Sequence, residues 1–405
     1  MTPIEPTTAE HGAVQAPARP HAVLAKPCPQ ALHRDKVPAM LEASFCRTRQ
    51  QRLLRAMYAK NIGAVVLGWR SHVYYFTGHW PFWQHQAAFV LFSNGKSALV
   101  CAREPDRSAT ADECITYDST WMSTNRQEQS ALAAENVLEL LADRRARRIG
   151  IDAAGPTAPV AISFEGEKVS IEAELFQLRR KKDPDELAIM RLAIECTRKM
   201  YERARQFIEP GIPELKVFSE LHEVAVTTAG RPLSAHLGND FACGERGGPP
   251  RNQRIAKSGE LYILDLGPAV TGYFSDNCRA IAVNRKPTDA QLNALNIVKG
   301  VFPIVETIAK PGAKCREIFS TVNEYYRQKT GGEFPHHLGH GVGLSPHEFP
   351  HLNPRWDDVL QEGEIFTCEP GVYGDSLAQG IRIENQYRVT ADGVENLTPF
   401  PMELA

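Results

Sequence analysis

Hydrophobic and polar positions alternate in short runs along the first half of the chain. Leucine and methionine recur at helical spacing over residues 49–60, and a similar pattern over residues 127–141 predicts a second helix. Short apolar runs rich in β-branched or aromatic residues predict strands over residues 62–67, 73–77, 87–92, 97–101 and 148–152. The pair Asn94-Gly95 between two of these runs is typical of a β-hairpin. Strands that alternate with helices favour a small α/β domain, which we place over residues 44–179.

The second half of the chain opens with a strong helix start. Asp183 is a suitable N-cap, Pro184 fits the first helical position, and Glu186 completes a capping box. An apolar face at helical spacing then runs to Phe207, Pro210-Gly211 ends this helix, and another helical pattern follows. These positions predict a helical pair at the start of a second domain.

The same plan occurs a second time further along the chain. Residues 288–310 begin with the capping residue Thr288, end at Pro311-Gly312, and precede a further predicted helix. Phe-Ser follows Pro-Gly at the same separation in both copies, at Phe218-Ser219 and Phe319-Ser320. Two halves of about 100 residues, each with two helices and a β segment, indicate an internal duplication. We therefore expect an α+β domain over residues 180–405, with a site between its halves.

The composition is that of a globular protein, and the net charge limits the kinds of partner that are expected. Of the 405 residues, 43% are hydrophobic and 23% are charged, and the net charge of −2 gives no reason to expect nucleic acid or an anionic membrane as partner. The short basic clusters at residues 144–148 and 179–182 are expected to be solvated helix ends or linkers. No apolar run approaches the roughly 18 residues of a membrane helix.

The cysteines and the first residues of the chain add to this picture. Nine cysteines stand without CxxC or CxxH spacing, so a disulfide framework or a structural zinc site is not expected, and a reducing, cytoplasmic compartment fits best. Residues 1–43 are rich in Pro, Ala and Thr and lack the apolar core of a secretory signal. We expect them to form a mobile tail or a strap across a partner subunit.

Acidic residues stand in the predicted β segments of both halves. Asp265 ends a strongly apolar strand, and Asp276 lies in the predicted return strand of a hairpin. Glu369 ends a strand, Glu384 lies in another, and His340 stands in the glycine-rich segment that precedes them. Each signal is weak alone, because a buried Asp often belongs to a polar network, Glu-Pro-Gly often ends a strand, and a His-Gly segment is often a loop.

Together these five residues point to bound metal. Burying an unpaired carboxylate costs on the order of several kcal/mol, so four carboxylates and an imidazole that converge need cations between them. An oxygen-rich set of ligands suits Mn²⁺ and similar divalent ions better than a thiolate zinc site does. Two such ions can share a water, lower its pKa and stabilise a tetrahedral intermediate.

Several stretches of the chain resemble one known family. They are Leu264-Asp265-Leu266-Gly267, Gly272-Tyr273 to Asp276 with Arg279, Gly339-His340-Gly341-Val342-Gly343-Leu344, His347-Glu348, Glu369-Pro370-Gly371 and Ile381-Arg382-Ile383-Glu384-Asn385. In these stretches the chain is similar to the pita-bread metallopeptidases (family M24). The linker at residues 178–186 and the strand predicted at residues 74–78 resemble the aminopeptidase P/prolidase/creatinase branch. The resemblance implies a creatinase-type N-terminal domain over residues 44–179 and a pita-bread catalytic domain over residues 180–405.

The resemblance also implies a role for each of the five residues. Asp276 and Glu384 resemble the carboxylates that bridge both ions in this family. Asp265 resembles a bidentate ligand of the first ion, and His340 and Glu369 resemble ligands of the second. The implied cofactors are two divalent metal ions, expected to be Mn²⁺, with Co, Fe or Zn as alternatives.

Catalytic and substrate-binding roles are implied in the same way. Glu369 is expected to relay protons from the bridging water, and His347 resembles a histidine that contacts the scissile group. His336, four residues before His340, resembles a histidine near the substrate in proline-specific members. Arg382 resembles an arginine that holds the carboxylates or the substrate. Without the family, a turn cap would explain His347 and a surface cation would explain Arg382.

The chain departs from the family at the rim of the expected pocket. Relatives usually carry a further histidine about 17 residues or more before the first aspartate, whereas residues 244–252 contain none and His236 lies further upstream. Glu245, Arg246 and Arg251 stand there and could recognise a carboxylate or another polar group. We therefore expect weak or absent activity on generic Xaa-Pro dipeptides and better activity on a small, charged amide whose anionic end meets Arg246 or Arg251.

The function that fits best is metal-dependent hydrolysis of a C–N amide bond in a small molecule or short peptide, of the Xaa-Pro dipeptidase or aminopeptidase type. A creatinase-like hydrolase of a non-peptide C–N bond is the main alternative, although creatinase lacks the full set of metal ligands. Lyases that cleave dimethylsulfoniopropionate tend to have an aspartate where His347 stands, and non-catalytic pita-bread binding modules have generally lost metal ligands. A homodimer is expected by resemblance, because in relatives the N-terminal domain shapes the pocket of the neighbouring subunit.

Overall fold

The computed structural model describes residues 40–405 except residues 82, 106–108, 154–155 and 236–239. Nearly all of the tail expected over residues 1–43 lies outside the described residues, and so does His236. Within the described ranges, no helix is both long enough and apolar enough to cross a membrane.

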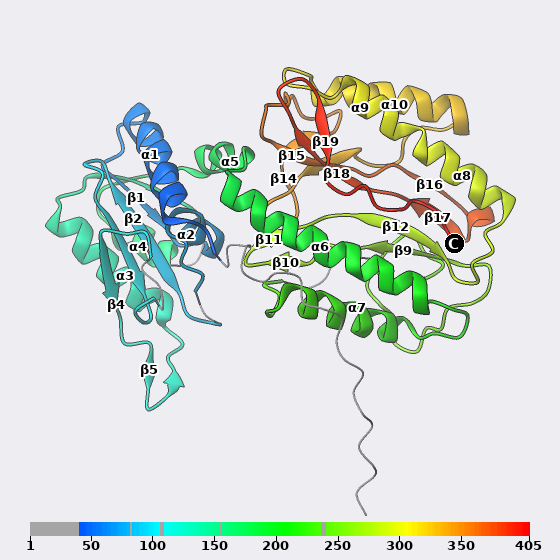
Figure 1. Ribbon diagram of the computed structural model, residues 1–405. Coiled ribbons are helices and arrows are strands. Elements are labelled where there is room, and N and C mark those ends of the chain that lie inside the picture. Colours follow the sequence, from blue (N-terminus) through cyan, green and yellow to red (C-terminus); the bar gives the residue numbers. More distant parts are fainter. Residues whose placement is uncertain (1–39, 82, 106–108, 154–155, 236–239) are drawn as a thin grey trace, which may run out of the picture. The chain divides into compact units, whose positions relative to one another are not determined.

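The N-terminal domain is built on a mixed six-stranded sheet (Figure 1). Across the sheet, the strands β4, β3, β2, β1, β7 and β8 are Glu113–Thr116, Ser97–Cys101, Ala87–Phe92, Ala64–Leu67, Arg148–Ile151 and Glu167–Ser170. The helices are α1 (Ala43–Ala59), α2 (Arg70–Thr77), α3 (Gln129–Asp143), α4 (Thr157–Ser163) and α5 (Glu172–Arg180), and a separate hairpin joins β5 (Thr120–Trp121) to β6 (Thr124–Asn125). Val65 and Leu67 of β1 pack in one core cluster with side chains of α1. Ala64 and Val66, on the opposite face, pack in another cluster with side chains of α3, so both faces of the sheet are covered.

Residues 73–77 form a helix and not the strand predicted from their aromatic and β-branched side chains. They belong to α2, in which all residues after Arg70 are buried. A helix that is buried on all sides has no apolar–polar period, so the pattern that marks a helix is missing. Gly78, interpreted as a strand end, is the left-handed residue that ends α2, with φ of 71°. The other helices and strands predicted in this domain are confirmed, including the β2–β3 hairpin with Gly95 at φ 84°.

The C-terminal domain combines helices with short antiparallel sheets (Figure 1). Its helices are α6 (Pro184–Phe207), α7 (Glu214–Ala229), α8 (Asp289–Lys299), α9 (Val301–Ile308), α10 (Cys315–Thr330) and the 3-10 turn η2 (Asp375–Leu377). Its strands are β9 (Leu261–Asp265), β10 (Ala269–Val270), β11 (Tyr273–Phe274), β12 (Cys278–Ala282), β13 (Gly339–Gly341), β14 (Glu348–Leu352), β15 (Ile365–Cys368), β16 (Gly371–Gly374), β17 (Gln379–Arg382), β18 (Asn385–Val389) and β19 (Val394–Asn396). In the first half β9 pairs with β12, and in the second half the sheet order is β14-β13-β15-β18-β19.

Backbone hydrogen bonds repeat between the two halves and confirm the internal duplication. Gly211 N donates to Ala256 O at 2.8 Å, and Gly312 N donates to Leu360 O at 2.9 Å. Each of these Pro-Gly turns leads into the second helix of its pair, α7 or α10. The antiparallel pairs β9–β12 and β15–β18 then occupy corresponding places in the two halves.

Two elements of this domain differ from the prediction. The helix predicted over residues 288–310 is divided into α8 and α9, which meet at Gly300. Pro303 has no N–H to donate to the carbonyl of Lys299, and glycine is unfavourable inside a helix, so the chain starts a new helix here. The return strand predicted to carry Asp276 begins only at Cys278, because the short β10–β11 hairpin precedes it.

One of the two basic clusters expected to be solvated is largely buried. The side chains of Arg179, Arg180 and Lys182 are 3%, 6% and 2% exposed. Arg179 pairs with Glu348 and Arg180 pairs with Glu364, which stand 169 and 184 residues further along the chain. The prediction was wrong because a charge run shows only local sequence, whereas its partners come from distant strands.

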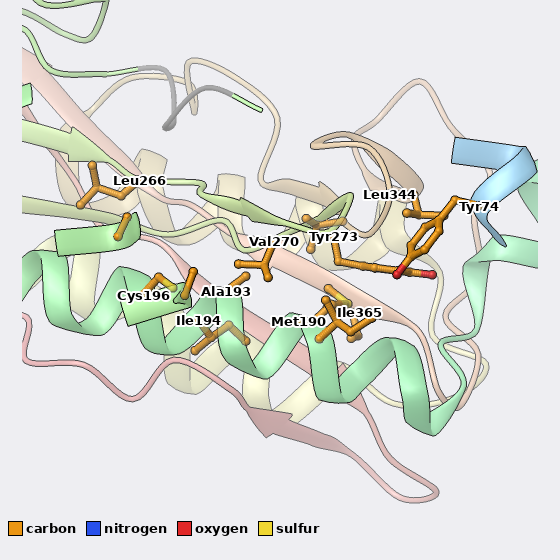
Figure 2. Close-up of a cluster of buried hydrophobic side chains, with 14 of the residues drawn as sticks. Tyr74, Met190, Ala193, Ile194, Cys196, Leu266, Val270, Tyr273, Leu344 and Ile365 are labelled. Carbon is orange, nitrogen blue, oxygen red and sulfur yellow. The ribbon is translucent and has the colours of Figure 1, made fainter. Parts of the chain in front are cut away.

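The hydrophobic core includes side chains from both domains. Figure 2 shows Met190 of α6 near the β10–β11 hairpin, which contributes Val270 and Tyr273. Tyr74 of α2 belongs to the same cluster, with its ring centroid 6.3 Å from that of Tyr273, and Leu344 lies beside it. The segment around Leu344 is therefore packed against the N-terminal domain.

A buried cluster of charges also joins the two domains. Arg49 of α1 contacts carboxylates at the start of α6, on Asp183, Asp185 and Glu186. Arg52 adds a second positive charge, 2.8 Å from Asp183. Because two positive charges face three carboxylates, one carboxyl group is left without a counter-ion, and burial raises the pKa of Glu186 to about 7. Glu186 completes the predicted capping box by accepting a hydrogen bond from Asp183 N at 2.9 Å.

Glu186→Gln is expected to change how stability depends on pH. A carboxyl group with a raised folded-state pKa stabilises the fold while it is protonated, so this contribution is complete below about pH 4.5 and is lost as pH rises through about 7. Glutamine keeps the shape without the charge. Relative to wild type, the free energy of unfolding of the variant should therefore rise by about 3 kcal/mol between pH 4.5 and pH 8. Urea unfolding at both pH values measures this difference, and an equal difference at both would contradict the assignment.

Candidate metal centre

The ends of strands bring the predicted ligands to one place. Asp265 is the last residue of β9 and Glu369 directly follows β15, so the two occupy equivalent positions in the two halves. Asp276 lies just before β12, and Glu384 lies in the turn between β17 and β18. Glu384 N donates to Cys278 O at 2.9 Å, which joins these two segments. The junction of the duplicated halves is therefore lined by carboxylates from both.

His340 of β13 lies among these carboxylates. Its Nε2 atom is 3.3 Å from Glu369 Oε1 and 3.8 Å from Asp276 Oδ2. One ligand atom each of Asp276, His340 and Glu384 lie within 4.8 Å of one another. All five predicted ligands, including Asp265, are buried.

The hydrogen bonds of His340 direct its free lone pair toward the carboxylates. Its Nδ1 atom lies 3.0 Å from Gly341 O, and a carbonyl only accepts, so the ring proton is on Nδ1. The unprotonated Nε2 atom is then available to a cation. Glycines flank His340 because β13 lies between β14 and β15, and an added Cβ would collide with the carbonyl of Thr367 at Gly339 and with that of Phe349 at Gly341.

The carboxylates repel one another strongly. Burial, and then the charges of Asp265 and Glu369, raise the pKa of Asp276 well above its usual range. Burial and the charge of Asp276 have the same effect on the pKa of Glu384. Burial raises the pKa of Asp265 to about 6, although Arg382 opposes it. A divalent cation between these groups would remove the repulsion.

Unpartnered oxygen atoms also fit cations at this place. Asp265 Oδ1 and Glu384 Oε2 are buried and have no hydrogen bond to the described residues. Buried polar atoms nearly always have a partner, so these two carboxylate oxygens are available to coordinate a cation. Carboxylate oxygens with one imidazole are ligands that hard divalent ions accept. The residues present therefore fit divalent metal ions.

His337 is a contact of this centre that the sequence alone did not single out. Its Nε2 atom lies 2.9 Å from Glu369 Oε1. Burial alone would raise the pKa of Glu369, but the hydrogen bond from His337 acts against burial, and that pKa lies well below its usual range. Burial alone would lower the pKa of His337, but Glu369 raises it. A histidine next to the predicted His336 gives no separate signal in sequence.

Both ring nitrogens of the neighbouring His336 form hydrogen bonds within the protein. Its Nδ1 atom lies 2.7 Å from His337 O, so this nitrogen donates, and its Nε2 atom accepts from Tyr373 OH at 2.9 Å. Burial lowers the pKa of His336. The structure therefore places His336 beside Tyr373, a residue that sequence reasoning missed, and a contact between His336 and substrate stays a prediction.

Arg382 connects a predicted ligand to the rim. Its Nη2 atom donates to Asp265 Oδ2 at 2.8 Å and also contacts Asp240. Asp240 Oδ1 accepts from Gly248 N at 2.5 Å, and Arg382 Nη1 donates to Arg246 O at 3.2 Å. Asp240 was missed from sequence because it lies in an irregular segment, where no hydrophobic period marks a buried side.

The two rim arginines differ in what they contact. Arg251 pairs with Glu214 at 2.7 Å and with Glu245 at 2.8 Å, so its charge is already compensated. The guanidinium of Arg246 lies 5.5 Å from the ring centroid of Tyr373. Among the described residues, no carboxylate lies within ion-pair distance of Arg246. Of the two, Arg246 is the one whose charge is available to a ligand.

His347 lies against the centre from the loop between β13 and β14. Its ring stacks on that of His340, with centroids 3.7 Å apart and planes inclined by 11°. Burial, and then the neighbouring His340 and His337, lower the pKa of His347 to about 4. The structure thus brings together the five predicted ligands, His347 and Arg382.

Comparison with known proteins agrees with both domains. Residues 188–391 match metallopeptidase family M24, and residues 49–165 match the creatinase/prolidase N-terminal domain. The chain is 30% identical over 243 residues to a putative dipeptidase of Bacillus subtilis strain 168, a match that covers 58% of this chain and 65% of that protein. It is 29% identical over 339 residues to an uncharacterized peptidase of Staphylococcus aureus strain MW2, covering 81% of this chain and 92% of that one.

Solved structures share the fold. A Xaa-Pro dipeptidase from Bacillus anthracis has a TM-score of 0.76 at 23% identity, covering 89% of this chain and 99% of that chain. The prolidase from Pyrococcus furiosus has a TM-score of 0.71 at 24% identity, covering 86% and 99%. An α/β domain followed by a duplicated α+β domain with a buried acidic centre defines a metal-dependent hydrolase of the pita-bread class. This chain belongs to metallopeptidase family M24, with the N-terminal domain of the creatinase/prolidase branch.

Proposed function

We propose that this enzyme is a dinuclear peptidase of the Xaa-Pro dipeptidase or aminopeptidase type. The observation that carries the proposal is the convergence of four buried carboxylates and one imidazole where the duplicated halves meet. The proposed ligands are Asp265, Asp276, His340, Glu369 and Glu384. Oxygen ligands favour Mn²⁺, with Co, Fe or Zn as alternatives. When bound, two such ions lower the pKa of a shared water and polarise the scissile carbonyl.

The side chains around this centre are proposed to orient the peptide and move protons. Glu369 stands 2.9 Å from His337, so a proton that Glu369 accepts from the attacking water has a path away from the reacting atoms. His347, stacked on a proposed ligand, is placed to contact the scissile group. Arg382 orients Asp265 through their 2.8 Å contact, and His336 forms an adjoining wall with Tyr373.

We propose that the substrate is a short peptide whose free carboxylate meets Arg246. The support is the exposed guanidinium of Arg246, which has no carboxylate within ion-pair distance among the described residues. The carbonyl of Arg246 accepts a hydrogen bond from Arg382, which links this loop to the centre. Relatives described as dipeptidases act, by their names, on molecules with such a carboxylate close to the scissile bond. Arg251 is assigned to the structure of the rim, because Glu214 and Glu245 occupy it. Weak or absent activity on generic Xaa-Pro dipeptides stays a prediction, and peptide amides, which lack the carboxylate, are expected to be the poorest substrates.

Arg246→Ala is expected to raise KM about 10-fold for a dipeptide with a free carboxylate, equivalent to roughly 1.4 kcal/mol. KM for the same dipeptide as its C-terminal amide should not change, because the amide carries no charge for Arg246 to meet. Arg246→Lys keeps the positive charge and should fall between the two. Steady-state kinetics of the Mn²⁺-loaded enzyme, on Xaa-Pro dipeptides, their amides and creatine, measures these values.

Two outcomes of this panel would count against the proposal. Equal changes in KM for acid and amide would remove Arg246 from substrate recognition. Failure of the metal-loaded wild type to hydrolyse any peptide in the panel, with hydrolysis of creatine, would favour the creatinase-like alternative.

Three proposals concern the molecule as a whole. We propose that the chain divides into residues 44–179 and 180–405, and that it forms a homodimer. The exposed Trp121 and Met122 at the turn of the β5–β6 hairpin support a contact between copies, and light scattering would measure the mass. We also propose a cytoplasmic location, because the eight cysteines among the described residues are all free thiols. No nucleic acid or membrane partner is proposed.

A further inference from the structure

The turn that carries His347 is closed by one carboxylate. Ser345 N donates to Glu348 Oε1 at 2.9 Å, so the chain bends back around His347. The base of this turn is tight, because a Cβ added at Gly343 would lie 2.9 Å from Glu348 Oε2 and equally close to Lys182 Cε. Glu348 therefore holds the turn from which the ring of His347 projects toward His340.

Arg179 of α5 holds Glu348 from the side of the N-terminal domain. Its Nη2 atom donates to Glu348 Oε1 and lies 3.2 Å from Ser345 Oγ. Lys182 Nζ lies 3.3 Å from the other oxygen, Glu348 Oε2. The guanidinium lies over the ring of Trp69, 4.9 Å from its centroid. Charge-assisted bonds in a buried place are directional, so a shift of Arg179 would shift Glu348.

A buried histidine–aspartate pair in turn orients Arg179. Arg179 Nη1 lies 3.4 Å from His72 Nε2, and because a guanidinium only donates, this nitrogen accepts. The proton of His72 is then on Nδ1, which donates to Asp152 Oδ2 at 2.9 Å. Asp152 accepts from Gly68 N and Trp69 N, at 3.0 and 2.9 Å, just before α2 begins. His72 and Asp152 are each 1% exposed, and no catalytic role accounts for them.

We infer that Asp152 and His72 are positioning residues for His347, acting through Arg179 and Glu348. The relay begins in the N-terminal domain and ends at the ring that stacks on a proposed metal ligand. This inference rests on the proposed function, in which His347 contacts the scissile group. It gives the N-terminal domain a task within its own chain, separate from any contact with another copy.

Asp152→Asn tests the relay at its far end. The amide keeps an oxygen at the Oδ1 position for Gly68 N–H. An NH₂ group at the Oδ2 position faces His72 Nδ1, which moves the His72 proton to Nε2, and it gives up the bond from Trp69 N. That proton then faces Arg179, which has only donors, and the contact is lost. We expect kcat to fall about 10-fold, with KM changed by no more than about twofold, because a small displacement of a reacting group costs rate more than binding. Metal content should not change, and hydrogen exchange of residues 342–348 should accelerate.

Substitutions of His72 supply a rescue, and a neighbouring tyrosine supplies a control. His72→Leu removes both bonds of the relay, whereas His72→Gln keeps a carbonyl that can accept from Arg179 and should recover most of kcat. Tyr117→Phe is the matched control, because Tyr117 is buried in the same domain and its hydroxyl donates to a backbone carbonyl at 2.8 Å outside the relay. If Asp152→Asn and His72→Leu lower kcat no more than Tyr117→Phe does, the inference is wrong.

Hydrogen exchange and metal content need no substrate, so this test separates two kinds of failure. A wild type that hydrolyses no peptide would contradict the proposed function, and faster exchange of residues 342–348 in Asp152→Asn would still support the relay. Unchanged exchange in that variant would overturn the relay, whatever the activity of the wild type.

Discussion

Asp276→Ala and Glu384→Ala are each expected to lower kcat/KM by at least about 1,000-fold, because each removes a proposed bridge between two ions. The fold should survive. Glu384 has an oxygen atom with no partner among the described residues, so the protein loses little of its own bonding when this side chain is removed. Because the carboxylates repel one another, Tm of the metal-free variants should equal or exceed that of the metal-free wild type. Kinetics, elemental analysis and thermal unfolding measure the three quantities.

A buried carboxylate with a partner in the protein provides the matched control. Glu364 is fully buried and pairs with Arg180, so Glu364→Gln should lower Tm while metal content stays at the wild-type level. Near-normal turnover with metal bound in Asp276→Ala or Glu384→Ala would show that the assignment of ligands is wrong.

Removal of metal by a chelator is expected to abolish hydrolysis and to lower Tm in the same step. An ion that binds only the folded protein adds about 4 kcal/mol of stability when its free concentration is about 1,000 times Kd. Reconstitution with Mn²⁺ should restore both properties as the content approaches about two ions per chain. Elemental analysis and thermal unfolding on the same samples give the stoichiometry and the stabilisation.

Two other values of the metal content would each contradict a different part of the proposal. A content near zero after reconstitution would contradict the enzymatic mechanism as a whole. A content near one, with full activity, would contradict the bridging roles of Asp276 and Glu384 but leave His340 and the peptidase assignment in place.

Residues at the ends of strongly patterned strands were the ones that sequence could identify. Asp265 ends an apolar run that predicts a buried strand, and Glu369 directly follows another, so a charged side chain stands out at both positions. His340 stands between glycines that the close approach of three strands requires. The duplication was visible because Pro-Gly turns recur at the same place in both halves. Local pattern was therefore enough to predict the fold class and to gather the candidate ligands.

The rest depends on contacts between distant segments. Asp240 lies beside the centre through its contact with Arg382, and Tyr373 through its hydrogen bond to His336. No spacing in the sequence predicts either contact. Arg179 belongs to a charge run that predicts solvent exposure, and only the position of Glu348 shows why it is buried. In the same way, the sequence of α2 shows no helical alternation of apolar and polar positions, because neighbouring elements cover the helix on all sides.

The duplication has a consequence for how the enzyme acquires its ions. Synthesis proceeds along the chain, so Asp265 and Asp276 are made well before His340, Glu369 and Glu384. A chain interrupted between the halves holds two of the five proposed ligands, both carboxylates, which are too few to retain a divalent ion. We therefore expect metal to enter after both halves have closed on each other. Sites of this kind bind several divalent ions, so the metal found in a purified sample is expected to reflect which ion was available to the folded protein in the cell.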